Sequence, residues 1–230
     1  MFIDPIAHFH SPLTSKFGIP RQSGLVKGLE GKIVFTPRYR HEEAIRGLEQ
    51  FDYLWIIWEF SANPKQEPFA NKLTVRPPRL GGNERVGVFA SRSPFRPNAL
   101  GLSCVYINRI EQSPLFGHVI HVDGADLMDG TPIYDIKPYV VYADSHPDAR
   151  SGFVDEVEWH PLEVDIPDSV AESLPEEQLS GLRQVLAQDP RPQYHDDDRT
   201  YGMSFAGKEI RFRVQNGVLT VLEAVPSGFR

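Results

Sequence analysis

Short apolar runs separated by proline and glycine fill the first 142 residues, and this feature limits the possible folds most strongly. The runs are rich in β-branched and aromatic residues, which favours strands over helices. We predict strands at residues 31–36, 51–60, 86–90, 102–110, 117–122 and 133–141. Many short strands with turn signals between them are typical of a barrel or a curved sheet. We therefore expect a mainly β N-terminal domain over residues 1–145.

A helical pattern interrupts this series once, at residues 41–50, where Ala44, Ile45 and Leu48 share one side. Beyond the strands, residues 144–168 are acidic and contain prolines, which is typical of a linker that leads into a second unit.

The second unit begins with a predicted helix at residues 173–188. Ser173 is a candidate cap and Pro175 suits the first turn. Residues 209–225 are predicted to form a hairpin, because Asn216-Gly217 can supply the positive φ values of a type I′ turn. We therefore expect a small α+β C-terminal domain over residues 146–230.

The cysteine and apolar content predicts a soluble protein of a reducing compartment. Cys104 is the only cysteine, which excludes an internal disulfide and a cysteine-based zinc site. The longest dense apolar run, residues 53–58, is too short to span a bilayer, and the N-terminal residues lack a signal-peptide pattern. We expect a cytoplasmic location. The scattered histidines predict no metal site.

The net charge of -7 is unevenly spread along the chain. Residues 72–109 carry seven basic side chains and one acid, whereas residues 142–200 carry fifteen acids and four arginines. Local positive potential matters more for phosphate binding than the total charge does, so the basic segment is a candidate nucleic-acid contact. The alternative is that these arginines form surface ion pairs.

Three segments are dense in polar residues that secondary structure does not require: residues 17–24 (FGIPRQSG), residues 75–101 with five arginines, and residues 123–139 with four aspartates. Arginine forks suit carboxylates and phosphates, and carboxylates at a turn suit a cation or an amine. A surface turn, structural ion pairs and backbone caps are the respective alternatives. The P-loop, GxGxxG and GxSxG motifs are absent, so the usual nucleotide-binding and serine-hydrolase folds have no support here.

These segments strongly resemble the TrmO family, also called TsaA-like or YaeB-like proteins. The matching motifs are FGIPRQSGLVKG, IRGLEQFDYLWIIWEF, VRPPRLGGNERVGVFASRSPFRPNALGLS, DLMDGTPIYDIKPY and DPRPQYHDDDRTYGM. They follow in order over nearly the whole chain, which makes the resemblance highly specific.

The resemblance implies a tRNA methyltransferase that uses S-adenosylmethionine. The enzyme would methylate N6 of N6-threonylcarbamoyladenosine (t6A) at position 37, beside the anticodon, giving m6t6A in threonine tRNA. The family fold is a single-sheeted β-barrel, to which bacterial members add a C-terminal module. Family members form homodimers and bind S-adenosylmethionine at a dimer-related site.

The resemblance also assigns residues to the site. The cofactor residues would be Arg21, Gln22, Ser61, Ala62, Arg92, Leu102, Asp129, Gly130, Thr131 and Pro132. The substrate-binding residues would be Arg76, Arg79, Arg96, Asn98, Lys137 and Tyr139. Asp129 or Asp135 is the candidate catalytic base, although positioning without a base is an equally open mechanism.

Two other functions remain open at this point. One is a non-catalytic module that binds S-adenosylmethionine or a nucleotide and acts as a sensor or an RNA-binding adaptor. The other is a metal-dependent RNA hydrolase built on the aspartate segment, which is disfavoured because the carboxylates lack paired spacing across two elements.

Overall fold

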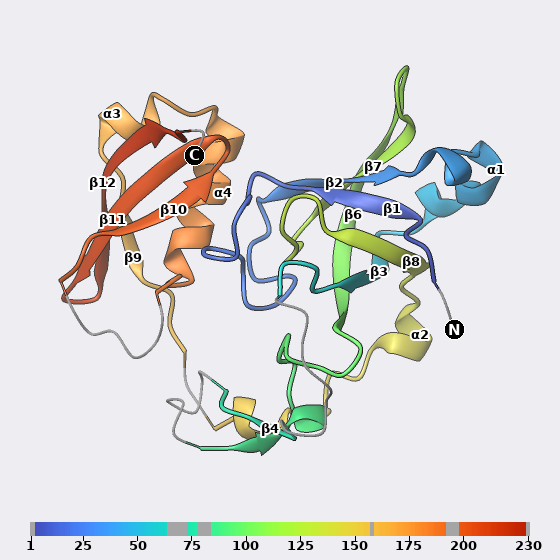
Figure 1. The fold of residues 1–230 in the computed structure, drawn as a ribbon, viewed down its shortest axis with the longest axis horizontal. Helices are drawn as coiled ribbons and strands as arrows, with labels where there is room; N and C mark the ends of the chain where they lie inside the picture. Colours follow the sequence, from blue (N-terminus) through green and yellow to red (C-terminus); the bar gives the residue numbers. More distant parts are fainter. Residues whose placement is uncertain (1–2, 64–72, 78–83, 157–158, 192–197, 229–230) are drawn as a thin grey trace.

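The structure is a computed structural model, and it describes residues 3–63, 73–77, 84–156, 159–191 and 198–228. Within these ranges the strands form a closed N-terminal sheet, a four-stranded C-terminal sheet and a two-stranded ribbon. Figure 1 shows the two larger sheets side by side, with the ribbon below them. No helix in the described ranges is long and apolar enough to cross a membrane.

Six antiparallel strands build the N-terminal sheet: β1 (Ala7–His10), β2 (Glu30–Phe35), β3 (Tyr53–Glu59), β6 (Leu100–Ser113), β7 (Gly117–Asp123) and β8 (Pro132–Pro138). Their order is β1-β2-β7-β6-β3-β8. Because β1 pairs with both β2 and β8, the sheet closes on itself. Five of the predicted strands correspond to β2, β3, β6, β7 and β8, so the expectation of a mainly β N-terminal part is confirmed.

Two glycines allow large side chains to fill the interior of this closed sheet. A Cβ atom on Gly31 would lie 2.1 Å from the ring of Phe9, and one on Gly101 would lie 2.3 Å from the ring of Trp58. Phe9 and Trp58 are 1% and 6% exposed. The core of the N-terminal part therefore depends on these two close approaches.

The predicted helix over residues 41–50 is wrong as a single element. The structure has a 3-10 turn η1 (Pro37–Tyr39), a short helix α1 (Glu42–Ile45) and a second turn η2 (Leu48–Gln50). Gly47 has φ 87°, in the left-handed region, and this conformation breaks the helix between Ile45 and Leu48.

The predicted strand over residues 86–90 is correct only for its first two residues. β5 (Val86–Gly87) pairs with β4 (Thr74–Val75), and a 3-10 turn η5 (Val88–Ala90) follows. Ser91 and Arg96 both donate side-chain hydrogen bonds to the carbonyl of Val88, and these contacts stabilise the turn. After β8 come α2 (Val141–Asp144) and the turn η6 (Gly152–Val154).

The C-terminal sheet has the order β10-β11-β12-β9, and its elements are β9 (Glu163–Asp165), α3 (Asp168–Ala171), α4 (Glu176–Ala187), β10 (Tyr201–Phe205), β11 (Lys208–Gln215) and β12 (Val218–Pro226). Asn216 and Gly217 have φ values of 51° and 79°, so the predicted hairpin and its turn are confirmed. The separate small α+β unit is therefore present.

The predicted helix at residues 173–188 begins later than expected. Pro175 is the N-cap of α4 and lies outside its first turn, and no side chain caps the helix. Ser173 instead donates a 2.7 Å hydrogen bond to the carbonyl of Val170 at the end of α3. Leu182, Val185 and Leu186 form the buried face of α4.

The N-terminal loop, residues 11–29, belongs to both parts of the molecule. It connects β1 to β2 of the closed sheet, but its buried residues Leu13, Val26 and Leu29 lie in the core of the C-terminal unit. Phe17 and Ile19 pack against the same core. The C-terminal unit is thus completed by residues from the N-terminal part of the sequence.

Candidate active site

Arg92 and Gln22 join two of the segments that the sequence predicts to be functional. Nη1 of Arg92 donates a hydrogen bond of 2.6 Å to Oε1 of Gln22, across 70 positions of sequence. Arg92 is exposed and Gln22 is half-buried. The N-terminal loop and the ASRS segment, residues 90–93, therefore meet at one place, which is the geometry that a shared pocket requires.

Asp126 brings the aspartate-rich segment to the same place. Ser103 donates a 2.5 Å hydrogen bond to Oδ1 of Asp126 and accepts one of 2.9 Å from the indole N–H of Trp58. Burial raises the pKa of the Asp126 carboxyl above its ordinary value, against the opposing effects of the Ser103 hydrogen bond, the charge of Arg92 and the backbone of Ser23. A carboxyl group held in this way is a strong candidate for a functional role.

Sequence reasoning did not assign Asp126 to the site. It is one of four aspartates in residues 123–139, and nothing in their spacing separates it from Asp123 or Asp129. The distinguishing property is tertiary: its carboxyl group is buried beside Ser103 on β6, which donates a hydrogen bond to it. One sequence signal could have indicated a polar partner here. The alternation along β6 places Ser103 on the inner face among apolar residues, where its hydroxyl needs a hydrogen-bond partner, and Asp126 provides one.

Two hydrogen bonds hold the middle of the N-terminal loop against the closed sheet. The backbone N–H of Cys104 on β6 donates a 3.3 Å hydrogen bond to Oγ of Ser23. The backbone N–H of Gly24 donates one of 2.8 Å to the carbonyl of Gly124. A Cβ atom on Gly124 would lie 3.4 Å from Cα of Gly24, so the two backbones approach closely. Residues 22–24 are thereby fixed beside the segment that contains Asp126.

The DGTP turn, residues 129–132, packs against the end of β1. Oδ1 of Asp129 accepts a 3.1 Å hydrogen bond from the backbone N–H of Ser11 and lies 3.2 Å from Nδ1 of His10. Gly130 has φ 77° and donates a 2.8 Å hydrogen bond to the carbonyl of Phe9. Thr131 is buried. The turn is therefore rigidly placed, three residues along the chain from Asp126.

The turn that contains Ser61 and Ala62 lies next to the arginine-rich segment. Asn63 donates a 3.2 Å hydrogen bond from Nδ2 to the carbonyl of Pro94. Its Oδ1 accepts a 2.7 Å hydrogen bond from Nζ of Lys16. Asn63 therefore links this turn both to the segment that contains Arg92 and to the N-terminal loop.

Other predicted residues lie on the outer face of the closed sheet. Asp135 is paired with Ile57, Lys137 with Trp55 and Leu102 with Ile57. Leu102 is 60% exposed. Tyr139 packs its ring against Tyr53 and Trp55, at centroid distances of 6.1 and 5.9 Å. Among the residues that the structure describes, no hydrogen bond or ion pair joins this group to the Gln22–Arg92–Asp126 cluster.

The two candidate bases, Asp129 and Asp135, are separated by about 20 Å of chain if the intervening residues are extended. Oδ1 of Asp135 accepts a 3.0 Å hydrogen bond from the backbone N–H of Ile136. Only Asp129 lies at the end of the sheet where the N-terminal loop meets the aspartate segment.

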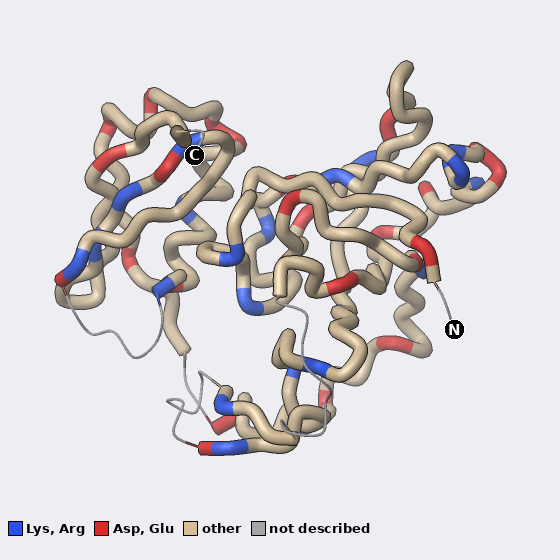
Figure 2. Tube along the Cα trace, in the orientation of Figure 1, with Lys and Arg blue, Asp and Glu red and all other residues tan. Residues whose placement is uncertain are grey.

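The predicted substrate residues of the basic segment have different environments. Arg96 donates hydrogen bonds to the carbonyls of Val88 and Ser91, at 3.4 and 2.6 Å, which gives it a structural role in the turn. Asn98 and Arg76 are exposed. Arg79 lies outside the described residues. In Figure 2 basic residue positions, coloured blue, lie along the backbone near β4 and β5.

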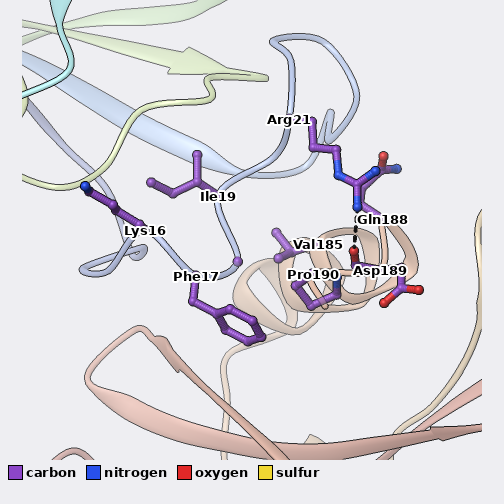
Figure 3. A pocket seen from close by; sticks show the side chains of 9 residues that line it. Lys16, Phe17, Ile19, Arg21, Val185, Gln188, Asp189 and Pro190 are labelled. Carbon is purple, nitrogen blue, oxygen red and sulfur yellow. Dashed lines mark hydrogen bonds between the residues drawn. The ribbon is translucent and has the colours of Figure 1, made fainter. Parts of the chain in front are cut away.

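Arg21 faces the C-terminal unit, on a different side of the loop from Gln22. Its Nη2 donates a 3.4 Å hydrogen bond to the carbonyl of Asp189, just after α4 (Figure 3). A small pocket there is lined by Lys16, Phe17, Gly18, Ile19, Arg21, Val185, Gln188, Asp189 and Pro190. Arg21, a predicted cofactor residue, thus contacts the second unit.

The chemistry of the cluster suits a ligand that carries both a cation and a carboxylate. Arg92 offers a guanidinium to a carboxylate, and Asp126 and Asp129 offer carboxylates to a cation. The amide of Gln22 can bind hydroxyl or ring nitrogen groups. S-adenosylmethionine has all of these features. No group of metal-ligating side chains is found among the residues that the structure describes.

Comparisons with known proteins agree over nearly the whole chain. The family model of the tRNA-methyltransferase O N-terminal domain matches residues 8–145, and that of the TrmO C-terminal domain matches residues 160–227. The tRNA (adenine(37)-N6)-methyltransferase of Escherichia coli strain K12 is 37% identical over 240 residues, which cover 97% of this chain and 97% of that protein.

Two further similarities come from Pseudomonas aeruginosa. The PAO1 protein RcsF, whose name contains the words S-adenosylmethionine-dependent methyltransferase, is 39% identical over 209 residues, or 87% of each protein. A crystal structure of TrmO from this organism matches with a TM-score of 0.78 at 29% identity, covering 98% of each chain.

Proposed function

The chain belongs to the TrmO family, and from this membership we propose that it is an S-adenosylmethionine-dependent methyltransferase that modifies N6 of adenosine 37 in tRNA. We further propose that the substrate is t6A37, that the product is m6t6A, and that threonine tRNA is the target. Residues 1–145, with the closed sheet as a single-sheeted barrel, would form the catalytic domain, and residues 146–230 the added C-terminal domain.

The observation that supports this proposal best is the meeting of Gln22, Arg92 and Asp126. These residues come from three segments that are far apart in the sequence, and hydrogen bonds and charge connect them at one end of the closed sheet. Arg92 is exposed and Gln22 is half-buried, so both side chains can reach a ligand from solvent.

S-adenosylmethionine, when bound, supplies the methyl group on its sulfonium. The chain's residues would bind and orient: Arg92 would hold a carboxylate, while Asp126 and Asp129 would lie near the cation. Backbone carbonyls of the DGTP turn would add to this negative environment. Positioning of the N6 nitrogen supplies much of the rate.

The proton on N6 of t6A is acidified by the adjacent carbamoyl group, so a weak base is sufficient. Asp129 is better placed for this role than Asp135, because it lies at the same end of the sheet as the cluster, whereas Asp135 is on the outer face beside Ile57. We therefore propose Asp129 as the proton acceptor if a base is used at all.

The tRNA would lie along the basic segment. Arg76 is exposed beside the ribbon, and Arg92 is exposed at the cluster, so both are available to anionic groups. Asn98, which is also exposed, would contact the nucleotide. Arg96 would act by fixing the turn that precedes Arg92, since its guanidinium is bound to backbone carbonyls. A protein of this kind fits the cytoplasm, where Cys104 remains reduced.

A homodimer is part of the proposal. The outer face of β3 and β6 exposes Leu102 (60%), Tyr53 (45%) and Tyr106 (42%), with the two tyrosine rings 5.4 Å apart. Tyr139 extends the same apolar face, and Lys137 borders it. A second copy packed here would place Leu102 at the interface, which agrees with a cofactor site related to the dimer. Sedimentation of Leu102→Glu against the unaltered chain tests this: the variant should be monomeric.

The test of the activity uses purified protein, S-adenosylmethionine and tRNA that carries t6A37. Mass spectrometry of the digested tRNA should show the t6A nucleoside converted into a species heavier by one methyl group. Tight binding of S-adenosylmethionine without any product would instead establish a non-catalytic binding module. Methylation of tRNA with unmodified A37 and not of t6A37 would contradict the proposed substrate.

A further inference from the structure

The N-terminal loop is held from two sides, and one of these sides is the C-terminal unit. Toward the closed sheet it is fixed through Ser23 and Gly24, next to the cluster. Toward the C-terminal unit, Oε1 of Gln184 on α4 accepts hydrogen bonds from the backbone N–H groups of Lys27 and Gly28, at 3.0 and 3.3 Å. One side chain therefore satisfies two consecutive loop donors.

The amide of Gln184 is oriented for this contact. Its Nε2 donates a hydrogen bond of 3.5 Å to Oγ of Ser180, one turn earlier on α4, which leaves Oε1 directed toward the loop. Two glycines make the approach possible. A Cβ atom on Gly181 would lie 3.0 Å from the carbonyl oxygen of Gly28, and a Cβ atom on Gly28 would lie 2.7 Å from Nε2 of Gln184.

Three more contacts bind the beginning and middle of the loop to the same unit. The carbonyl of Pro12 accepts a 2.8 Å hydrogen bond from the backbone N–H of Ala206. Gly18 has φ 97°, and a Cβ atom there would lie 2.1 Å from the sulfur of Met203 on β10. Arg21 reaches the carbonyl of Asp189 after α4, as Figure 3 shows.

We propose that the C-terminal unit positions the cofactor-binding loop, and that Gln184 is a positioning residue for it. Gln22, the loop residue that contacts Arg92, is flanked on both sides by contacts with the C-terminal unit. These contacts involve Pro12, Gly18 and Arg21 before it and residues 27–28 after it. The C-terminal unit thus sets the path of the loop on both sides of that residue. This inference rests on the proposed assignment of the loop to the S-adenosylmethionine site, and it gives the C-terminal unit a role without any contact with tRNA.

Isothermal titration of S-adenosylmethionine into the full chain tests the inference. Gln184→Ala removes the acceptor of two loop N–H groups, so we expect the Kd to rise at least fivefold. Gln184→Glu keeps an oxygen acceptor and should stay within twofold of the unaltered chain. Gln178→Ala is the matched control, since Gln178 is an exposed glutamine on the same helix, and its Kd should not change.

Steady-state kinetics separate positioning from general destabilisation. Gln184→Ala should raise the KM for S-adenosylmethionine while kcat and the KM for tRNA stay within twofold. Gly181→Ala keeps Gln184, shifts the loop by crowding the Gly28 carbonyl, and should raise the same KM at least twofold. An unaltered Kd and KM in both variants, with normal binding by the parent chain, would overturn the inference. Absence of binding by the parent chain would overturn the proposed function as well.

Discussion

Arg92 donates a 2.6 Å hydrogen bond to the side-chain oxygen of Gln22, and this contact connects a loop at the start of the chain with a segment 70 positions later. Next to it, Ser103 connects Asp126 to Trp58, whose ring fills the interior of the closed sheet. The candidate site is therefore continuous with the core through a chain of hydrogen bonds. Changes in the core and changes in the site should affect each other.

Removal of the Arg92 guanidinium should lower methyl transfer without unfolding the protein. We expect Arg92→Ala to reduce kcat/KM on t6A-containing tRNA at least tenfold, because the cofactor carboxylate loses a charge-assisted partner worth about 1.5–3 kcal/mol. Arg213→Ala, at an exposed arginine of β11, is the control and should retain full activity. Equal activity of the two variants would remove Arg92 from the site.

Asp126→Asn should increase stability at neutral pH and decrease activity. The folded-state pKa of Asp126 is raised mainly by burial. A carboxyl group whose pKa is raised in the folded state adds to the free energy of unfolding. This added stability is fully present below the unfolded-state pKa and is lost as the pH rises through the folded-state pKa. Asparagine keeps an oxygen acceptor for Ser103 and does not ionise, so the variant does not lose this stability at neutral pH. Each kcal/mol gained would raise Tm by about 2–4 °C.

Thermal denaturation at two pH values tests this prediction for Asp126. The Tm of Asp126→Asn should exceed that of the parent chain at pH 7, and the two Tm values should converge at about pH 3, where both states of the parent carry a protonated carboxyl. A Tm difference of the same size at both pH values would mean that burial does not raise the pKa of this carboxyl group.

The Glu30–Arg109 pair predicts the opposite pH dependence. Burial acts to raise the pKa of Glu30, but hydrogen bonds from Arg109 and His121, at 2.6 and 2.9 Å, outweigh it and lower the pKa. The stability that ionised Glu30 contributes is thus present above its unfolded-state pKa and is lost as the pH falls through its folded-state pKa. Arg109→Ala should cost about 0.2–1 kcal/mol at pH 7, since the pair is partly exposed, and almost nothing at pH 2–3. Urea denaturation at both pH values measures this.

A methyl group on Gly101 should damage both the core and the site. Its Cβ atom would lie 2.3 Å from the ring of Trp58, so the ring must move, and with it the indole N–H that binds Ser103. We expect Gly101→Ala to cost about 1–3 kcal/mol of stability. Gly31→Ala crowds Phe9 in the same core and is the matched control. Only the Gly101 variant should also weaken S-adenosylmethionine binding, as titration would show.

Binding of tRNA should weaken steeply with salt, because phosphate contacts release counterions. Between 50 and 200 mM salt we expect a loss of affinity of about tenfold or more. Arg76→Ala should reduce the slope of log Kd against log salt concentration, as filter binding would measure. A slope near zero for the parent chain would contradict the role of the basic segment.

Local sequence patterns predicted β2, β3, β6, β7, β8 and the C-terminal hairpin because the determinants of these elements are local. β-branched and aromatic alternation marks β3, and Asn216-Gly217 marks the type I′ turn. The helix at residues 41–50 was misjudged for an equally local reason: its apolar spacing is helical, but Gly47 adopts φ 87° and ends the helix. Ser173, a good helix cap by type, binds the preceding helix instead.

The site was predictable as a set of segments but not as a set of contacts. The dense polar segments and the family resemblance indicated Gln22 and Arg92, and the structure brings these two together. The resemblance assigned Arg21 to the same site, but its contact with the carbonyl of Asp189 depends on tertiary packing. Asp126 was not singled out, because burial and its partner Ser103 distinguish it from the other aspartates. The packing of Gly18 against Met203 joins residues of the two domains, and no periodic pattern in either segment records such a contact.

A crystal structure of the chain with S-adenosylhomocysteine, the stable product of the cofactor, shows whether Gln22 and Arg92 hold the cofactor. We expect ligand density in contact with Gln22 and Arg92, with Asp126 and the DGTP turn beside it. Density for the ligand elsewhere on the molecule, with Gln22 and Arg92 still bonded only to each other, would contradict this expectation.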